Sequence, residues 1–250
     1  MGPPRGPDPG NRCDVRVLFM RHDPASPPSL IGEAFEARGY DVVTDLIVDV
    51  EHYATPNVHF DFPDPTQFDA IVPMGSPWGA WDDERIGNWL IPELAWLREA
   101  NAAEVPVLGL CFGGQLLARA HGGSVAPAPV HEIGWTPVWS DDPTLVPEGP
   151  WFQFHYDRWE LPPGATEIAR TSRASQAFRL RRNLGVQFHP ELDAEMLLGW
   201  YDSPGDARSH VARDGQDPDI LLAQTRAFEG GARQRAQALV DGFLDRVATH

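Results

Sequence analysis

Short apolar runs alternate with stretches of helical periodicity along the first half of the chain. Helical spacing over residues 29–38 stops at Gly39, and a longer amphipathic stretch covers residues 84–102, with Pro92 expected to kink or restart it. The apolar runs between them predict buried strands at residues 14–20, 40–48, 68–73 and 105–110. This β-α-β order predicts a parallel sheet with right-handed crossovers.

The second half is first strand-like and then helical. Residues 151–157 alternate like a strand, and strands expected at residues 166–169, 177–180 and 185–188 complete the sheet. Helices are expected at residues 195–201, 218–228 and 232–247, with a polar, mobile loop at 203–217. We therefore expect one α/β domain over residues 14–250, with an open, mostly parallel, doubly wound sheet, helices on both faces and an extra C-terminal helical segment. Residues 1–13 read as a flexible Pro/Gly-rich leader.

Composition and charge exclude several classes of protein. The net charge of −16 leaves no basic patch for a nucleic acid or an anionic membrane. Every basic residue apart from histidine is Arg, which excludes a Schiff-base lysine and the phosphate-binding lysine of a P-loop. No apolar run is long enough to cross a bilayer, and the N-terminus lacks the apolar core of a signal peptide. A cytoplasmic location is the resulting expectation.

Cys13 and Cys111 are the two cysteines of the chain. Cys13 lies at the edge of the expected leader, so two free thiols in a reducing compartment are expected rather than a disulfide. The chain contains neither Cys-x-x-Cys nor His-x-x-x-His, so no metal site is expected.

The stretch 105–118 carries the first chemical signal. Its strand-like run leads through Gly109 to Cys111, then Gly113, and continues as a helix. Gly-x-Cys-x-Gly between a strand and a helix is the cysteine form of the nucleophile elbow, where side chains at the two glycines would collide with neighbouring elements. The helix N-terminus favours a thiolate there. The alternative is that Cys111 is only a small buried apolar residue.

A second stretch, 185–191, places His189 and Glu191 at the end of another apolar strand. A thiol needs a base to become a thiolate, and the imidazole of that base needs a partner that holds its tautomer. Cys111, His189 and Glu191 supply these three roles in order.

The two stretches, Gly-Leu-Cys-Phe-Gly-Gly-Gln and Gly-Val-Gln-Phe-His-Pro-Glu, closely resemble the class I (triad-type) glutamine amidotransferase domain. The resemblance runs from about Val15 to beyond Glu191. It is greatest to stand-alone proteins similar to the amidotransferase half of GMP synthase. It implies a flavodoxin-like sheet and hydrolysis of the side-chain amide of L-glutamine.

The resemblance also implies an oxyanion hole and a glutamine pocket. The loop 74–83 follows a predicted strand, and its Gly75-Ser76-Pro77 stands where the family usually has Gly-Gly-Pro. Backbone N–H groups of this loop, at Gly75 or Ser76, and of Phe112 are the implied oxyanion donors.

By the same resemblance, the glutamine pocket is expected at Gln115, Gly134 and Trp135, although Trp135 could instead serve strand packing. His155 and Asp157 match a His-x-Asp segment of related domains. His155 is the competing candidate for the base; the apolar strand before His189 and the carboxylate after it favour His189.

These residues predict an enzyme that hydrolyses glutamine through a γ-glutamyl thioester on Cys111, without a metal or organic cofactor. The chain is too short for a synthetase domain beside this one, so ammonia is expected either to reach a synthase subunit or to be released by a chain acting alone. One alternative is a γ-glutamyl hydrolase that acts on a γ-glutamyl amine or peptide. The other is a non-catalytic binding or regulatory module of the same fold.

Overall fold

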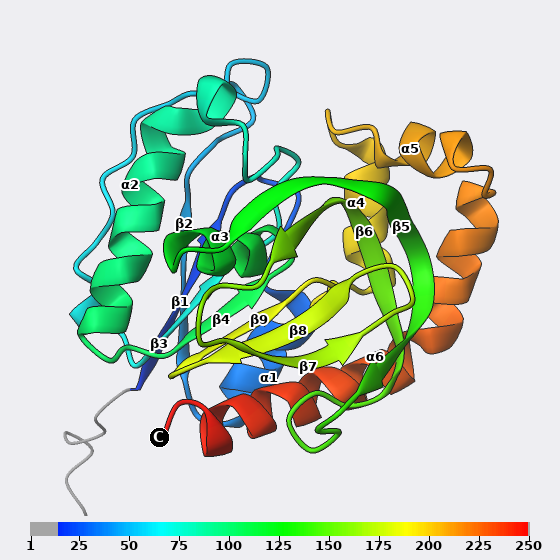
Figure 1. Cartoon of the computed structure of the whole chain (residues 1–250). Helices are drawn as coiled ribbons and strands as arrows, with labels where there is room; N and C mark the ends of the chain where they lie inside the picture. Colours follow the sequence, from blue (N-terminus) through cyan, green and yellow to red (C-terminus); the bar gives the residue numbers. More distant parts are fainter. Residues whose placement is uncertain (1–14, 250) are drawn as a thin grey trace, which may run out of the picture.

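A computed structural model describes residues 15–249, so the expected leader and Cys13 lie outside the described residues. Its centre is a nine-stranded sheet in the order β2-β1-β3-β4-β9-β8-β7-β5-β6 (Figure 1). The sheet has a parallel half and an antiparallel half that meet at β9. The expected class, an open and mostly parallel α/β sheet with helices and an extra C-terminal helix, is confirmed.

The parallel half lies between β2 and β9, and each strand in it is parallel to its neighbours. Its strands are β1 (Arg16–Arg21), β2 (Asp41–Leu46), β3 (Ala70–Pro73), β4 (Val107–Leu110) and β9 (Asn183–Val186). All four residues of β3, β4 and β9 are buried, which is what a parallel sheet covered on both faces requires.

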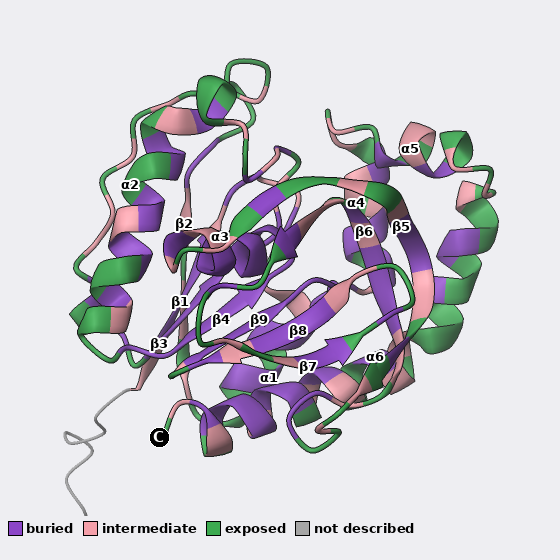
Figure 2. Cartoon of the chain, viewed as in Figure 1, coloured by how far each residue is buried: buried purple, intermediate pink, exposed green. Residues whose placement is uncertain are grey.

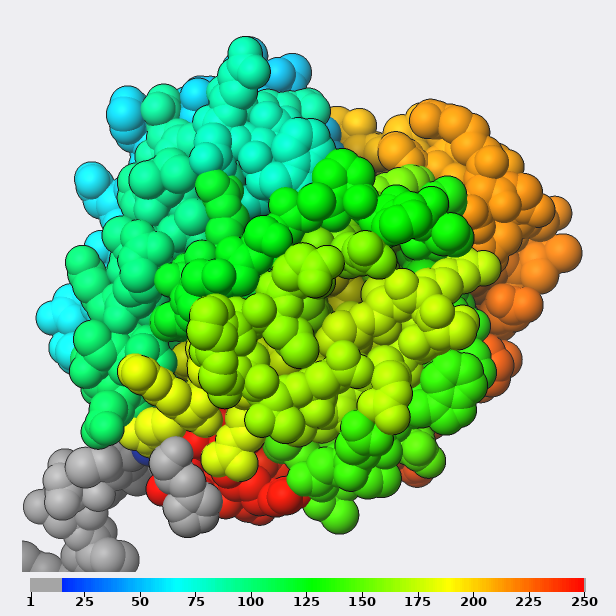
Figure 3. Space-filling view, in the orientation of Figure 1, coloured from blue at the N-terminus to red at the C-terminus, as the bar shows by residue number. Residues whose placement is uncertain are grey.

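The antiparallel half extends the sheet from β9 outward. Its strands are β5 (Ser124–Ser140), β6 (Gly149–Glu160), β7 (Thr166–Arg170) and β8 (Ser175–Leu180). The long β5 and β6 pair with each other, and β5 joins the sheet through β7 at its C-terminal end. In the space-filling view, residues of this half form much of the face turned to the viewer (Figure 3).

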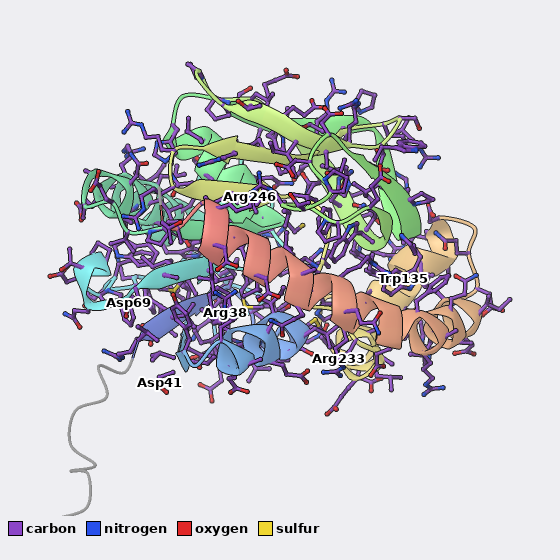
Figure 4. The ribbon with its side chains drawn as sticks, turned by 90° about the horizontal axis from the view of Figure 1, so that it is seen from below. Arg38, Asp41, Asp69, Trp135, Arg233 and Arg246 are labelled. Atoms are coloured by element: carbon purple, nitrogen blue, oxygen red, sulfur yellow. The ribbon has the colours of Figure 1, made fainter. Side chains whose placement is uncertain are left out.

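Helices cover both faces of the sheet. One buried cluster joins α1 (Ser29–Ala37) and the C-terminal half of α6 (Pro218–Arg246) to the sheet, and a second joins α2 (Asp83–Ala102) and α3 (Phe112–Ala120) to its other face. Figure 2 shows the strands buried between these helices. Seen from below, α6 lies alongside α1, where Arg38 and Arg233 are labelled (Figure 4). Arg38 pairs with Asp241 and Asp245 of α6.

A third buried cluster lies where the chain returns after β9. It packs α4 (Ala194–Asp202), α5 (Ala207–Arg213) and the start of α6 against β5 and β6. A short 3-10 turn, η1 (Pro65–Gln67), precedes β3. The third cluster brings residues of α5 next to the carboxyl ends of the strands, where the predicted site lies.

Two local expectations were wrong. The stretch 203–217 contains α5, because Asp206 accepts a hydrogen bond from the Ser209 N–H and Val211 is fully buried. The two expected helices after residue 217 are one, because buried positions continue along α6 past Gly230. The restart allowed for at Pro92 does not occur either, because α2 continues through this residue. Among the described residues, no helix is long and apolar enough to span a membrane.

Candidate active site

Four adjacent parallel strands deliver the predicted site. β1, β3, β4 and β9 are neighbours in the sheet, and their carboxyl ends lie at one edge. The residues that follow them are His22, the Gly75-Ser76 loop, Cys111, and Gln187 with His189. Open parallel sheets place binding sites at this edge.

Cys111 occupies a strained turn between β4 and α3. Its φ of 50° and ψ of −104° lie in a region that non-glycine residues rarely adopt. A Cβ at Gly109 would collide with the backbone of Gly113, and one at Gly113 would collide with the Pro73 carbonyl. The N–H of Cys111 donates to the Val186 carbonyl (2.8 Å), which ties the turn to β9. Gly109 and Gly113 are therefore required because neighbouring backbone lies too close to leave room for a side chain, and the elbow geometry is confirmed.

His189 and Glu191 form a buried pair beyond the end of β9. Nδ1 of His189 lies 2.8 Å from Oε1 of Glu191, whose side chain has no exposed surface. Burial acts to lower the pKa of His189, but the charges of Cys111 and Glu191 outweigh it and raise that pKa well above its ordinary value. Nε2 of His189 has no hydrogen-bond partner among residues 15–249. The ring therefore has one nitrogen held by a carboxylate and the other uncommitted.

Two buried glutamines form a relay to the sulfur. Nε2 of Gln187 lies 3.6 Å from Sγ of Cys111, and Oε1 of Gln187 accepts from Nε2 of Gln115 (3.2 Å). Gln187 is fully buried and Gln115 is 3% exposed. An amide N–H aimed at sulfur favours the thiolate over the thiol. Gln115 was expected in the glutamine pocket; the motif gave no sign of the contact between Gln187 and the sulfur.

The predicted oxyanion donors surround the same turn. The N–H of Phe112 belongs to the first turn of α3 and has no acceptor within the helix. The next donor, the N–H of Gly113, is already bonded to the Met74 carbonyl (3.1 Å). In the loop after β3, the N–H groups of Gly75 and Ser76 donate to no group within the described residues. A Cβ at Gly75 would approach Cε1 of His189 to 3.0 Å, so this loop lies directly against the imidazole.

Two cavities meet at this loop. The one on the Cys111 side is about 260 Å³, and Gln115, Asp157 and Trp81 are among the residues that line it. The one on the His189 side is about 80 Å³, and Asp23 and Trp200 contribute to its lining. Residues common to both are Ser76, Pro77, Phe154 and Gly205. The thiol and the imidazole thus open into different spaces on either side of the Ser76 loop.

His155, the competing base, is hydrogen-bonded through one ring nitrogen. Nδ1 lies 2.9 Å from the carbonyl of Asp157, and Nε2 lies 3.3 Å from Oε2 of Glu132 without making a hydrogen bond to any described residue. Asp157 accepts from the indole N–H of Trp81 (3.0 Å), and burial raises the pKa of its carboxyl. His155 and Asp157 line the wall of the Cys111-side cavity, whereas His189 is the ring whose pKa is raised by the charge of Cys111.

Gly134 and Trp135 lie apart from both cavity linings. The indole of Trp135 donates to Thr225 of α6 (3.0 Å) and packs edge-on against Phe152 and Phe228. Figure 4 shows Trp135 beside α6. Gly134 has a φ of 95°, and its nearest side chains are Gln216 and Leu221. In this structure the Trp135 side chain serves packing, and its assignment to the glutamine pocket stays a prediction.

Several lining residues were missed from the sequence. His210 and Ala207 come from α5, which was expected to be a loop, and Asp23 follows β1 in a turn to which no role was given. Burial raises the pKa of Asp23, whose oxygens accept from Ser26 and the Ala25 N–H. Within residues 15–249, no group of three His, Cys, Asp or Glu side chains is arranged to hold a metal ion.

Part of the chain matches a known protein family. Residues 79–196 match the family model "Glutamine amidotransferase class-I". GMP synthase [glutamine-hydrolyzing] of Aeropyrum pernix is 32% identical over 184 residues, which are 68% of this chain and 33% of the relative. The enzyme of the same name from Thermomicrobium roseum is 41% identical over 130 residues, 49% of this chain and 23% of the relative. The chain thus spans about a third or less of these curated relatives.

Solved structures show the same fold. A glutamine amidotransferase of Thermotoga maritima superposes with a TM-score of 0.79 at 24% identity, covering 94% of this chain and 100% of that one. A glutamine amido transferase of Methylobacillus flagellatus superposes with a TM-score of 0.73 at 24% identity, covering 92% of this chain and 94% of that one. On the family match and the sequence relatives, the chain belongs to the class I glutamine amidotransferase family, and the solved structures share its fold.

Proposed function

We propose that this chain hydrolyses the side-chain amide of L-glutamine, with Cys111 as nucleophile, His189 as general acid and base, and Glu191 as the group that orients the imidazole. The observation that carries the proposal is the His189 ring: it is buried, its Nδ1 is held by Glu191, and its pKa is raised by the charge of Cys111. A raised pKa favours an imidazolium beside a thiolate, which is the reactive form of such a pair.

In the first half-reaction the thiolate of Cys111 attacks the amide carbon, and the carbonyl oxygen becomes an oxyanion. The N–H groups of Phe112 and of the Gly75-Ser76 loop donate to no group within the described residues, so they are available to that oxygen. The imidazolium of His189 then gives its proton to the leaving nitrogen. The C–N bond breaks, ammonia departs, and a γ-glutamyl thioester remains on Cys111.

The second half-reaction uses the same groups. His189, now neutral, takes a proton from water, and the hydroxide attacks the thioester carbon. The second oxyanion collapses, the C–S bond breaks, and glutamate and the thiolate are released with His189 protonated again. The amide relay from Gln115 through Gln187 favours the thiolate at both ends of the cycle.

We further propose that the ammonia passes to a synthase site on a partner subunit. The curated relatives named above are GMP synthases, and the part of them that this chain matches covers about a third or less of their length. The acceptor is therefore sought by adding candidate synthase subunits and measuring whether glutamine hydrolysis accelerates.

The direct test measures ammonia and glutamate release from L-glutamine by the purified chain. Cys111→Ala should abolish release, whereas Cys13→Ala, which removes the other thiol, should leave it intact. Mass spectrometry of Cys111 during turnover should find the γ-glutamyl adduct. Release that persists in Cys111→Ala would refute the assigned nucleophile, and an intact protein that stays silent with and without partner subunits would refute the activity.

A second candidate, the γ-glutamyl hydrolase, is favoured by one observation. A separate cavity opens on the His189 side, where the leaving group receives its proton, and the walls that Trp200 and Tyr53 contribute could hold an amine larger than ammonia. γ-Glutamyl ethylamide and butylamide distinguish the two functions. Cleavage of either at a rate equal to that of glutamine supports the hydrolase, and cleavage of glutamine alone supports the amidotransferase.

A further inference from the structure

Another buried histidine–glutamate pair lies behind the site and takes no part in the proton transfers described above. His22 follows β1, and Glu93 lies on the buried face of α2. Nε2 of His22 is 3.1 Å from both carboxylate oxygens of Glu93, and neither side chain has any exposed surface. Burying a carboxylate and an imidazole together carries a desolvation cost, which the hydrogen bonds of this pair must offset.

The other nitrogen of His22 determines what the pair can do. Nδ1 lies 3.1 Å from the carbonyl oxygen of Gly75. A carbonyl only accepts hydrogen bonds, so Nδ1 must carry a hydrogen and donate it. The proton shared between Nε2 and Glu93 can belong to either partner without changing this bond. Glu93 therefore fixes the ring in the one orientation in which Nδ1–H holds the Gly75 carbonyl.

That carbonyl belongs to the peptide whose N–H is contributed by Ser76. In a trans peptide the C=O and the N–H point in opposite directions, and no described residue pair is joined by a cis bond. With the Gly75 oxygen held in the core by His22, the Ser76 N–H is turned the other way. Ser76 lines both cavities, and its N–H donates to no group within residues 15–249. The pair thus aims this N–H at the space between Cys111 and His189.

The same imidazole also touches the second oxyanion donor. The ring of His22 packs edge-on against the ring of Phe112, with centroids 4.7 Å apart. Phe112 supplies the N–H that follows the nucleophile. Trp89 of α2 packs on both rings, at 5.5 Å from His22 and 6.0 Å from Phe112. The buried side chain of His22 therefore contacts both segments that supply the oxyanion donors. Those donors, Ser76 and Phe112, are 36 positions apart in the sequence.

We propose that His22, held by Glu93, is the positioning residue of the oxyanion hole: it orients the Gly75–Ser76 peptide so that the Ser76 N–H faces the developing negative charge. This inference rests on the proposed glutamine hydrolysis. It also accounts for a serine at the position where the family usually has glycine. His22 imposes the orientation of the Gly75–Ser76 peptide, so this orientation does not depend on a glycine at position 76.

The test compares three substitutions of His22 in the full chain. His22→Leu removes the donor, His22→Asn places an amide N–H near the position of Nδ1, and His22→Gln places one near Nε2. For His22→Leu we expect kcat for glutamine to fall about 100-fold, because losing one oxyanion donor costs about 10²–10³ in kcat. KM should stay within about twofold, since the hydrogen bond strengthens only in the transition state. The kcat of His22→Asn should be at least tenfold higher than that of His22→Leu, whereas the kcat of His22→Gln should show no such recovery.

Alkylation of Cys111 by iodoacetamide supplies the control. It forms no oxyanion, so a positioning role predicts an unchanged alkylation rate in all three variants, and that rate also reports whether each variant has folded around an intact elbow. Glu93→Gln keeps a hydrogen-bond partner for Nε2 and should lower kcat less than His22→Leu does.

Three outcomes would overturn the inference. In the first, His22→Leu has the kcat of the wild type. In the second, kcat and the alkylation rate of Cys111 fall in parallel in His22→Leu. In the third, His22→Asn and His22→Gln recover kcat equally. In each of them the wild-type chain still hydrolyses glutamine, so the proposed function stands. A wild-type chain that neither hydrolyses glutamine nor reacts at Cys111 with a diazoketone analogue of glutamine overturns the proposed function, and the inference with it.

Discussion

Two of the buried histidine–glutamate pairs at the site differ in one contact. His189 is bound to Glu191 at 2.8 Å and His22 to Glu93 at 3.1 Å, and all four side chains are buried. The remaining nitrogen of His189 is without a partner among the described residues, whereas that of His22 is bonded to the Gly75 carbonyl. A free nitrogen beside a thiol can move protons, while a committed nitrogen can only hold a group in place. The second contact of the ring decides its role.

The largest difference in activity should appear when each of the two histidines is replaced by Asn in a separate variant. Asn can donate a hydrogen bond but cannot shuttle a proton, so His189→Asn should lower kcat/KM for glutamine by about 10³-fold, within the range that general acid–base catalysis supplies. His22→Asn should lower it less than tenfold, because its amide still reaches the Gly75 carbonyl. Steady-state kinetics of the two variants measures the contrast. Equal losses would show that the two rings do not differ in role.

A smaller effect is expected from removing the negative charge of each carboxylate. The pKa of His189 is raised, so its imidazolium persists above the usual range and is lost as the pH rises through that pKa. Glu191→Gln removes one of the two charges that raise it, so the pKa should fall and the alkaline limb of the pH–activity profile should move to lower pH. The loss at the optimum should be about 10²-fold, part of the acid–base contribution.

Glu93→Gln is the matched control for that experiment. Its partner His22 does not exchange protons with the substrate, so the alkaline limb should stay where it is in the wild type. Profiles of kcat/KM between pH 6 and pH 10 separate the two variants. A shift in Glu93→Gln, or none in Glu191→Gln, would contradict the assignment of the two pairs.

The two pairs also differ in how far the sequence reveals them. His189 and Glu191 are two positions apart after a strand, so a local motif shows the pair. His22 and Glu93 are 71 positions apart and meet only because α2 packs beside the end of β1. One signal was present: Glu93 falls among the apolar positions of α2, three after Leu90 and four after Trp89. A carboxylate on a buried face needs a partner, but nothing local identifies which.

The fold shows the same division between local and distant information. Apolar runs placed β1, β3, β4 and β9 close to their observed bounds, because a buried strand is a local hydrophobic signal. The loop expected at 203–217 and the break expected in α6 were wrong. α5 owes its order to burial of Ala207 and Val211, and α6 to its long packed face, and both come from tertiary contacts. Trp135, whose motif allowed either role, packs with its indole bonded to Thr225.

The smallest effect is expected from replacing Gln187, a substitution that distinguishes proton transfer from stabilisation of the Cys111 thiolate. Gln187 touches the sulfur without exchanging protons, so Gln187→Leu should leave the His189–Glu191 pair in place and remove one N–H donor. A hydrogen bond to a charged group contributes about 1.5–3 kcal/mol, so alkylation of Cys111 near neutral pH should slow about tenfold. Gln153→Leu is the matched control, because Gln153 is equally buried but bonds to Gln176. If both variants alkylate at the wild-type rate, the elbow and His189 alone hold the thiolate, and the glutamine relay serves only packing.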